Sequence, residues 1–156
     1  MIRVLALGLF RRAGRILVAG GSDPRTGERY FRPLGGGVEP GERAHEALRR
    51  EIGEELGAVA TDVQLVGVIE NIFEYDGATR HEVVFVFDAA FADASLYDRD
   101  ELPVVEAGGG WSPARWMHPA DFGEGRPRLV PPALLDLVRP GAPTPLPPAL
   151  CSAPAT

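Results

Sequence analysis

A glycine triplet followed by a helical pattern constrains this chain more than any other feature. Gly35–Gly37 stands where neither a helix nor a long strand is expected, because glycine weakens both. From Glu42 to Leu56 the periodicity is helical, and Gly57 occupies the position of a C-terminal capping glycine. Apolar residues recur four apart at Ala44, Leu48, Ile52 and Leu56. The pattern predicts a tight glycine loop joined to a short amphipathic helix.

Three carboxylates gather on one arc of that helix. At about 100° per residue, Glu51, Glu54 and Glu55 lie close together, and Glu55 falls almost in line with Leu48 on the apolar stripe. Like charges at this spacing repel, and a buried carboxylate is costly unless a cation compensates it. Magnesium suits such a site because it binds carboxylate oxygens together with waters and phosphates.

The alternative to a magnesium site is a solvent-exposed helix surface stabilised by ion pairs. Arg50 is spaced four residues from both Glu46 and Glu54, so simple salt bridges would account for charges opposite the apolar stripe. They would not account for Glu55 on the apolar side or for the glycine triplet. The pattern therefore favours a catalytic acidic site.

The segment from Gly36 to Ala58 resembles the Nudix box at every fixed glycine, arginine and glutamate. A glycine is followed by Glu42, then by Arg50-Glu51, Glu54-Glu55 and Gly57, while Ala58 replaces the usual bulkier aliphatic residue. The resemblance implies an α/β fold with a mixed, curved β-sheet sandwiched between α-helices. It implies a Nudix hydrolase domain over residues 1–139, followed by a Pro- and Ala-rich tail, 140–156.

The resemblance also implies roles for individual residues. The metal ligands would be Glu51, Glu54, Glu55 and the carbonyl of Gly35, with Mg²⁺ as the cofactor and Mn²⁺ as a substitute. Arg50 would orient a glutamate, Glu42 would support the site from the helix start, and Gly36 and Gly57 would complete the box. The general base varies in this family, and the candidates here are Glu54 and Glu82.

Substrate contacts are expected beyond the box. Arg32 and Arg80 could hold a terminal phosphate or be ordinary surface arginines. Aromatic side chains offer stacking surface for a base or could belong to the core: Phe73, Tyr75, Trp111 and Trp116. Tyr75 lies near the position where the diadenosine polyphosphate subgroup carries a tyrosine. The proline of the ADP-ribose subgroup is replaced by Ile72, and the coenzyme A pattern is absent.

Composition narrows the classes further. The net charge of −6 argues against nucleic-acid binding, and no apolar run is long enough for a membrane span. A single cysteine excludes an internal disulfide and suits a cytoplasmic protein. All sixteen basic residues are arginine, so a lysine-dependent phosphate loop is excluded. A monomer and a homodimer are both compatible with the sequence.

The remaining segments predict mainly strands, at Arg3–Phe10, Arg15–Ala19, Gln64–Tyr75, Glu82–Ala90 and Trp111–Met117, with a short helix at Pro131–Val138. The predicted function is magnesium-dependent cleavage of a phosphoanhydride in a nucleoside diphosphate linked to another moiety, such as a nucleoside triphosphate or dinucleoside polyphosphate. The alternative is a non-catalytic Nudix module that senses a nucleotide or regulates a partner. His45 and His118 have no partner pattern and are interpreted as structural or surface residues.

Overall fold

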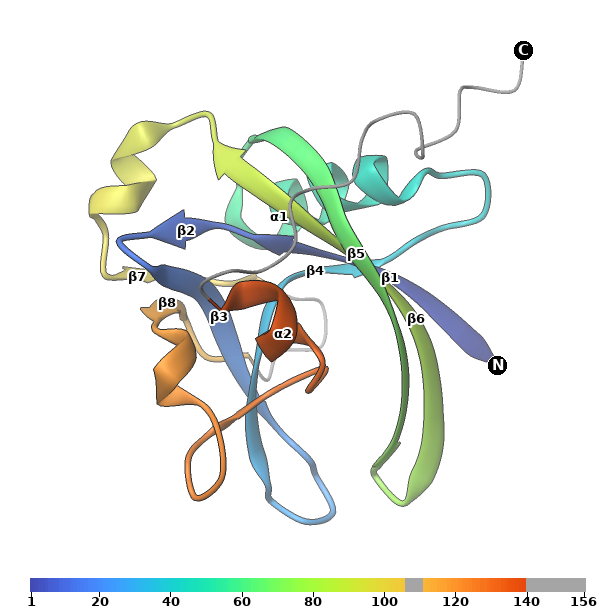
Figure 1. Ribbon diagram of the computed structural model, residues 1–156. Helices are drawn as coiled ribbons and strands as arrows, with labels where there is room; N and C mark the ends of the chain where they lie inside the picture. Colours follow the sequence, from blue (N-terminus) through green and yellow to red (C-terminus); the bar gives the residue numbers. More distant parts are fainter. Residues whose placement is uncertain (106–110, 140–156) are drawn as a thin grey trace.

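The computed structural model of the chain describes residues 1–105 and 111–139. Its central feature is one mixed sheet in the order β5-β6-β1-β4-β3-β8-β7 (Figure 1). The strands are β1 Ile2–Leu9, β2 Arg11–Arg12, β3 Arg15–Ser22, β4 Arg29–Gly37, β5 Ala60–Tyr75, β6 Ala78–Phe91, β7 Glu101–Leu102, β8 Ala114–Met117 and β9 Arg128–Leu129. The helices are α1 Ala44–Leu56 and α2 Leu134–Val138, with short 3-10 turns at Ala94–Asp98 and Pro119–Asp121.

The sheet is covered on both faces, as the sequence predicts. One core cluster joins Leu48 and Ile52 of α1 to Ala6 and Phe87 of the sheet. A second cluster joins Leu134 of α2 to other sheet residues, including Leu5, Leu7, Val84 and Val86. Successive side chains of a strand point to opposite faces, so β1 and β6 contribute to both clusters. The mixed sheet between helices is thereby confirmed.

The glycine triplet is not a loop, which corrects the prediction made from composition. Gly35–Gly37 forms the end of β4 and pairs antiparallel with Leu5–Leu7 of β1. Glycine is required there by the close packing around the strand. Gly35 has φ +138°, and a Cβ on it would strike the carbonyl oxygen of Ala6. The sequence signal marked close approach of backbone to its neighbours rather than an end to the strand.

Helix α1 begins two residues later than predicted. Arg43 is its N-cap, and the carboxylate of Glu46 accepts a hydrogen bond from the Arg43 N–H at 3.0 Å. The Glu46 carboxylate therefore caps the helix through its hydrogen bond with Arg43, and this bond takes the place of the predicted contact with Arg50. Gly57 ends the helix in the left-handed conformation, with φ +63°, as expected. Leu48 and Ile52 of the apolar stripe are buried against the sheet, and Glu55 is buried with them, whereas the terminal stripe residues are half-buried.

Strands β5 and β6 form a long hairpin around a turn at Asp76 and Gly77, both at positive φ. Both strands extend beyond their predicted bounds, so Glu82 lies inside β6 and does not open it. Strand β8 starts at Ala114 and is followed by β9, so the segment predicted as the last strand is not the last. The predicted tail, 140–156, and Cys151 lie outside the described residues.

Candidate active site

A single pocket of about 910 Å³ brings together residues from both ends of the chain. It is lined by strands β1, β4, β5 and β6, by helix α1, and by segments near Trp111 and Arg128. Eight residues predicted for metal, base or substrate roles line it: Arg32, Gly35, Glu51, Glu54, Glu55, Tyr75, Arg80 and Glu82. The fold therefore places these eight residues around one cavity.

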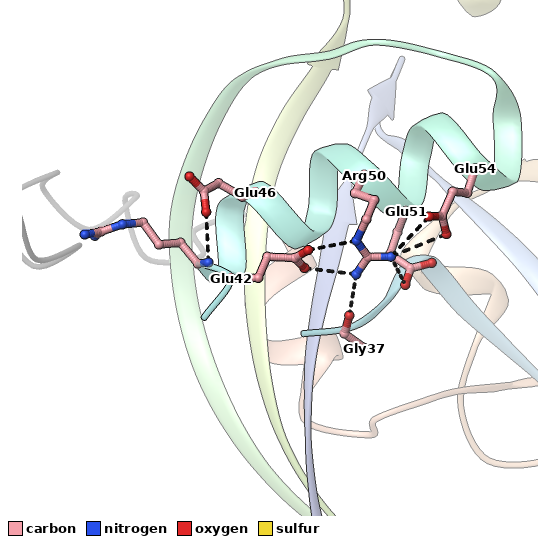
Figure 2. Close-up of polar contacts among 7 residues, drawn as sticks. Gly37, Glu42, Glu46, Arg50, Glu51 and Glu54 are labelled. Carbon is pink, nitrogen blue, oxygen red and sulfur yellow. Dashed lines mark hydrogen bonds and ion pairs between the residues drawn. The ribbon is translucent and has the colours of Figure 1, made fainter. Parts of the chain in front are cut away.

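Arg50 organises the helix end of this pocket without lining it (Figure 2). Its Nε and Nη2 donate to the two carboxylate oxygens of Glu42 at 2.8 and 2.9 Å. Its Nη1 donates to Glu51 at 3.0 Å and, more weakly, to Glu54 at 3.3 Å. Nη2 also donates to the Gly37 carbonyl at 2.8 Å, which ties α1 to the end of β4. One guanidinium thus fixes two of the candidate ligands relative to the strand.

Electrostatics in this cluster follow from the same contacts. The hydrogen bonds from Arg50 lower the pKa of Glu42, and those to Glu42 first and Glu51 next raise the pKa of Arg50. Glu42 precedes helix α1, and both of its carboxylate oxygens accept hydrogen bonds from Arg50. Its carboxylate therefore lies beside the guanidinium and not in the first turn of the helix. Its predicted supporting role stays a prediction with this contact as its basis.

Gly36 makes room for Glu51. An ideal Cβ built on Gly36 would lie 2.5 and 2.6 Å from the two carboxylate oxygens of Glu51, far inside van der Waals contact. The missing side chain therefore lets the Glu51 carboxylate rest against the β4 backbone. This explains physically why glycine at position 36 and glutamate at position 51 belong to one pattern.

Two further carboxylates are buried beside the pocket. Glu55 is 7% exposed and Glu82 is 9% exposed, which is rare for ionisable groups without a functional or structural partner. Arg3 lies across from Glu82 in the parallel pairing of β1 with β6, and its Nη1 is 3.8 Å from Glu82 Oε1. The register of these strands thus brings the candidate base Glu82 to the pocket.

The donor set fits a hard divalent cation. Three carboxylates from neighbouring positions of one helix open onto one pocket, and oxygen is the donor such ions prefer. In residues 1–105 and 111–139, no three Asp, Glu, His or Cys side chains already converge on one point. Glu51 and Glu54 turn toward Arg50 instead.

Aromatic side chains gather at another part of the pocket. Tyr30 meets Tyr75 edge to face at a centroid distance of 6.4 Å and Trp111 at 6.1 Å. Burial, followed by a hydrogen bond with Tyr75, raises the pKa of Tyr30 to about 12. The guanidinium of Arg32 lies 4.8 Å from the centre of the Trp111 ring. This group, Tyr30, Tyr75, Trp111 and Arg32, is called the aromatic end below.

The other substrate candidates separate clearly. Phe73 also lines the pocket, whereas Trp116 is a core residue stacked on Tyr97. Arg80 lines the pocket and is exposed. His118 accepts a hydrogen bond from the Ala120 N–H at 3.0 Å, as a structural histidine would.

Arg32 also contacts the acidic end of the pocket. Its Nη2 donates to the Gly35 carbonyl at 3.2 Å, the oxygen predicted to bind metal. Its Nε is buried and has no hydrogen-bond partner among residues 1–105 and 111–139. A carbonyl has two lone pairs, so this hydrogen bond leaves the Gly35 oxygen able to accept a second partner. Arg32 therefore touches both ends of the pocket.

Sequence reasoning missed several pocket residues. Arg3, Asp23, Glu28, Tyr30, Asn71 and Arg128 all line the cavity. Arg128 reaches it because β9 pairs in parallel with β4, and it forms an ion pair with Glu28 at 2.7 Å. Nothing local marks Arg128 or Glu28. Arg3 could have been found by placing its strand beside Glu82, but that register is visible only in the sheet.

The fold and the pocket together define a class: a mixed α/β domain whose pocket is lined by carboxylates of one helix at one end and by aromatic side chains at the other. The family model of the NUDIX domain matches residues 1–135. The chain belongs to the Nudix family. Hydrolases of this family generally use a divalent metal ion. No helix among residues 1–105 and 111–139 is long and apolar enough to span a bilayer.

Similarities to solved structures and to curated proteins support membership of this family. The crystal structure of a MutT Nudix hydrolase from Burkholderia pseudomallei superposes with a TM-score of 0.63 at 27% identity, covering 86% of this chain and 95% of that one. The NAD-capped RNA hydrolase NudC of Mycobacterium tuberculosis is 35% identical over 95 residues, 56% of this chain and 30% of its own. The nucleoside triphosphatase NudI of Escherichia coli is 87% identical over 23 residues, 15% of this chain and 16% of its own. The chain spans less than two thirds of the length of these curated relatives.

Proposed function

We propose that this protein is a magnesium-dependent pyrophosphohydrolase that acts on nucleoside triphosphates. The observation that carries the proposal is one pocket with an acidic end on α1 and an aromatic end between β4, β5 and Trp111. A nucleotide has matching parts, an anionic phosphate chain and a flat base. A volume of about 910 Å³ is in the range of small-molecule sites.

The acidic end would hold Mg²⁺, with Mn²⁺ as a substitute, through Glu51, Glu54, Glu55 and the Gly35 carbonyl. When bound, the ion neutralises phosphate oxygens and lowers the pKa of a coordinated water. Arg50 holds Glu51 and Glu54 in place by its hydrogen bonds. The oxygen of the attacking water bonds to phosphorus, the anhydride P–O bond breaks, and a carboxylate accepts the proton. Glu82 and Glu54 are the candidates for that acceptor.

Glu82 is the preferred base, since its carboxylate is buried in the pocket wall on a strand inside the sheet. Glu54 is 60% exposed at its side chain and already shares Arg50. Arg80, Arg3 and Arg32 supply positive charge around the cavity for the phosphate chain. The bidentate geometry of guanidinium suits phosphate oxygens.

Triphosphates are preferred over dinucleoside polyphosphates because of the NudI relative, a nucleoside triphosphatase. The rival function, a non-catalytic nucleotide sensor, is disfavoured because Glu51, Glu54 and Glu55 are all present and all line the pocket. A homodimer and a cytoplasmic location remain part of the proposal and have no bearing on its chemistry.

The test is a panel of nucleoside triphosphates, dinucleoside polyphosphates, NAD and ADP-ribose, each incubated with Mg²⁺. Product chromatography should show a nucleoside monophosphate and pyrophosphate from at least one triphosphate. The Glu55→Gln variant is the control for contaminating phosphatases. Tight nucleotide binding without turnover would favour the sensor, and turnover confined to dinucleotides would reassign the substrate.

A further inference from the structure

The pocket is bounded by two hairpins that meet at their tips. Hairpin β3–β4 and hairpin β5–β6 project in the same direction, with β1 between them in the sheet (Figure 1). Tyr30 belongs to the first hairpin and Tyr75 to the second, and their rings are in contact. The distance between the hairpins therefore sets the width of the aromatic end.

Asp23 joins the two tips. Its Oδ1 accepts hydrogen bonds from the N–H groups of Arg25 at 2.7 Å and Thr26 at 3.2 Å, within its own loop. Its Oδ2 accepts from the N–H of Asp76 at 3.1 Å, in the turn of the other hairpin. The residue is 8% exposed, so these bonds form away from competing water. One buried carboxylate thus holds two turns that are far apart in sequence.

Arg25 strengthens the junction. A Cβ on Gly77 would strike the guanidinium of Arg25, so the arginine packs directly over this glycine. Gly77 also has φ +72°, which disfavours any other residue at the turn. The N–H of Asp76 lowers the pKa of Asp23 most strongly. The contact set formed by Asp23, Arg25, Asp76 and Gly77 is called the clasp below.

We propose that Asp23 is a positioning residue: by bridging the two hairpins it fixes Tyr30 against Tyr75 at the aromatic end of the pocket and sets how tightly the substrate's base is bound. This inference rests on the proposed nucleotide substrate. Asp23 acts on binding and not on the phosphoryl chemistry, because both of its oxygens are engaged by backbone N–H groups. The clasp lies in the hairpin tips, whereas the carboxylates of the acidic end belong to helix α1.

The Asp23→Asn variant should keep the hydrogen bonds within the loop and remove the hydrogen bond between the two hairpins. The remaining amide oxygen can still accept from Arg25 and Thr26, but the NH₂ group that replaces Oδ2 cannot accept from Asp76. We expect KM for the preferred triphosphate to rise about tenfold while kcat changes less than about twofold. Asp23→Glu should restore little, because its extra methylene displaces both oxygens. A fall in kcat of about tenfold with unchanged KM would overturn the proposal.

Asp93→Asn is the matched control. Asp93 also accepts from a nearby backbone N–H, that of Ser95 at 3.0 Å, but it lies before the 3-10 turn and does not line the pocket. Its substitution should leave both KM and kcat unchanged. A KM rise equal to that of Asp23→Asn would show that loss of any such loop bond is enough, and the positioning role would be wrong.

Hydrogen exchange tests the clasp without catalysis. Amide exchange measured by mass spectrometry should quicken in the segment containing Asp76 and Gly77 in Asp23→Asn, and in both hairpin tips in Asp23→Ala. Unchanged exchange in both variants would mean that the clasp does not couple the tips. Faster exchange with unaltered KM would refute the positioning role. If the wild-type protein hydrolyses no nucleotide, the proposed function is wrong, and so is the role of Asp23 in base binding. The exchange result still shows whether Asp23 couples the two hairpin tips.

Discussion

The acidic end of the pocket draws its carboxylates from little more than one turn of α1, while the aromatic end draws its rings from three distant segments. Glu51, Glu54 and Glu55 are neighbours in sequence. Tyr30, Tyr75 and Trp111 are brought together only by the sheet and its hairpins. The local end is held by a helix and one arginine, whereas the distant end is held by long-range contacts such as the clasp.

This difference indicates a division of labour. A helix fixes the spacing of its side chains by its own geometry, so chemistry placed on it survives changes elsewhere. Rings that meet across hairpins depend on loop and turn contacts, which differ easily between relatives. We therefore expect changes at the acidic end to affect kcat for every substrate, and changes at the aromatic end to affect KM and base preference.

Metal removal should have the largest effect. With excess chelator, turnover of every nucleotide should fall below detection, because three carboxylates cannot hold a polyphosphate without a compensating cation. Measurement of pyrophosphate release before and after adding back Mg²⁺ or Mn²⁺ checks this. Full turnover in chelator would break the assignment of the acidic end as a cation site.

Glu55→Gln should come next, lowering kcat about a hundredfold or more for all substrates. Glutamine keeps the volume of this buried side chain, so the melting temperature should change little. Glu46→Gln is the matched control on the same helix, since glutamine can keep the capping contact and position 46 does not line the pocket. Near-normal turnover of Glu55→Gln at saturating Mg²⁺ would exclude it as a ligand.

Glu82→Gln tests the base, which lies on the sheet between the two ends. If Glu82 accepts the proton, kcat should fall about a hundredfold with KM little changed. If it binds metal instead, the Mg²⁺ concentration needed for half-maximal rate should rise. A fall in kcat/KM of less than about threefold would remove Glu82 from the reaction and leave Glu54 as the base.

Tyr75→Leu should raise KM about tenfold and alter the preference among the four bases, with kcat nearly constant. Tyr75→Phe separates stacking from hydrogen bonding, because it keeps the ring and loses the bond to Tyr30. We expect it to retain most of the affinity. Steady-state kinetics on all four triphosphates check both variants, and a large kcat loss in either would contradict the division between the two ends.

Removal of residues 140–156 should have the smallest effect. The segment contains few large apolar groups and no periodic pattern, so little of the free energy of unfolding should depend on it. Activity and melting temperature should both stay close to those of the full chain. A marked fall in either, or a change in mass by light scattering, would assign the segment a packing or assembly role.

The sequence by itself determined the acidic end and most of the architecture. Helix periodicity, the capping Gly57 and the spacing of Glu51, Glu54 and Glu55 are local properties, so they can be predicted without knowing the fold. The burial of Glu55 followed from its alignment with Leu48 on the apolar stripe. Strand β1 was likewise predicted, one residue away from its observed bounds at each end.

Only the tertiary structure decided how the glycine triplet and the pocket are used. Gly35–Gly37 continues a strand because it pairs with β1, and composition alone suggests a loop. Arg3 meets Glu82 through the register of parallel strands, and Asp23 meets Asp76 through the meeting of two hairpin tips. Contacts of this kind join residues far apart in the chain, and their geometry is set by packing and strand register, which no local pattern records.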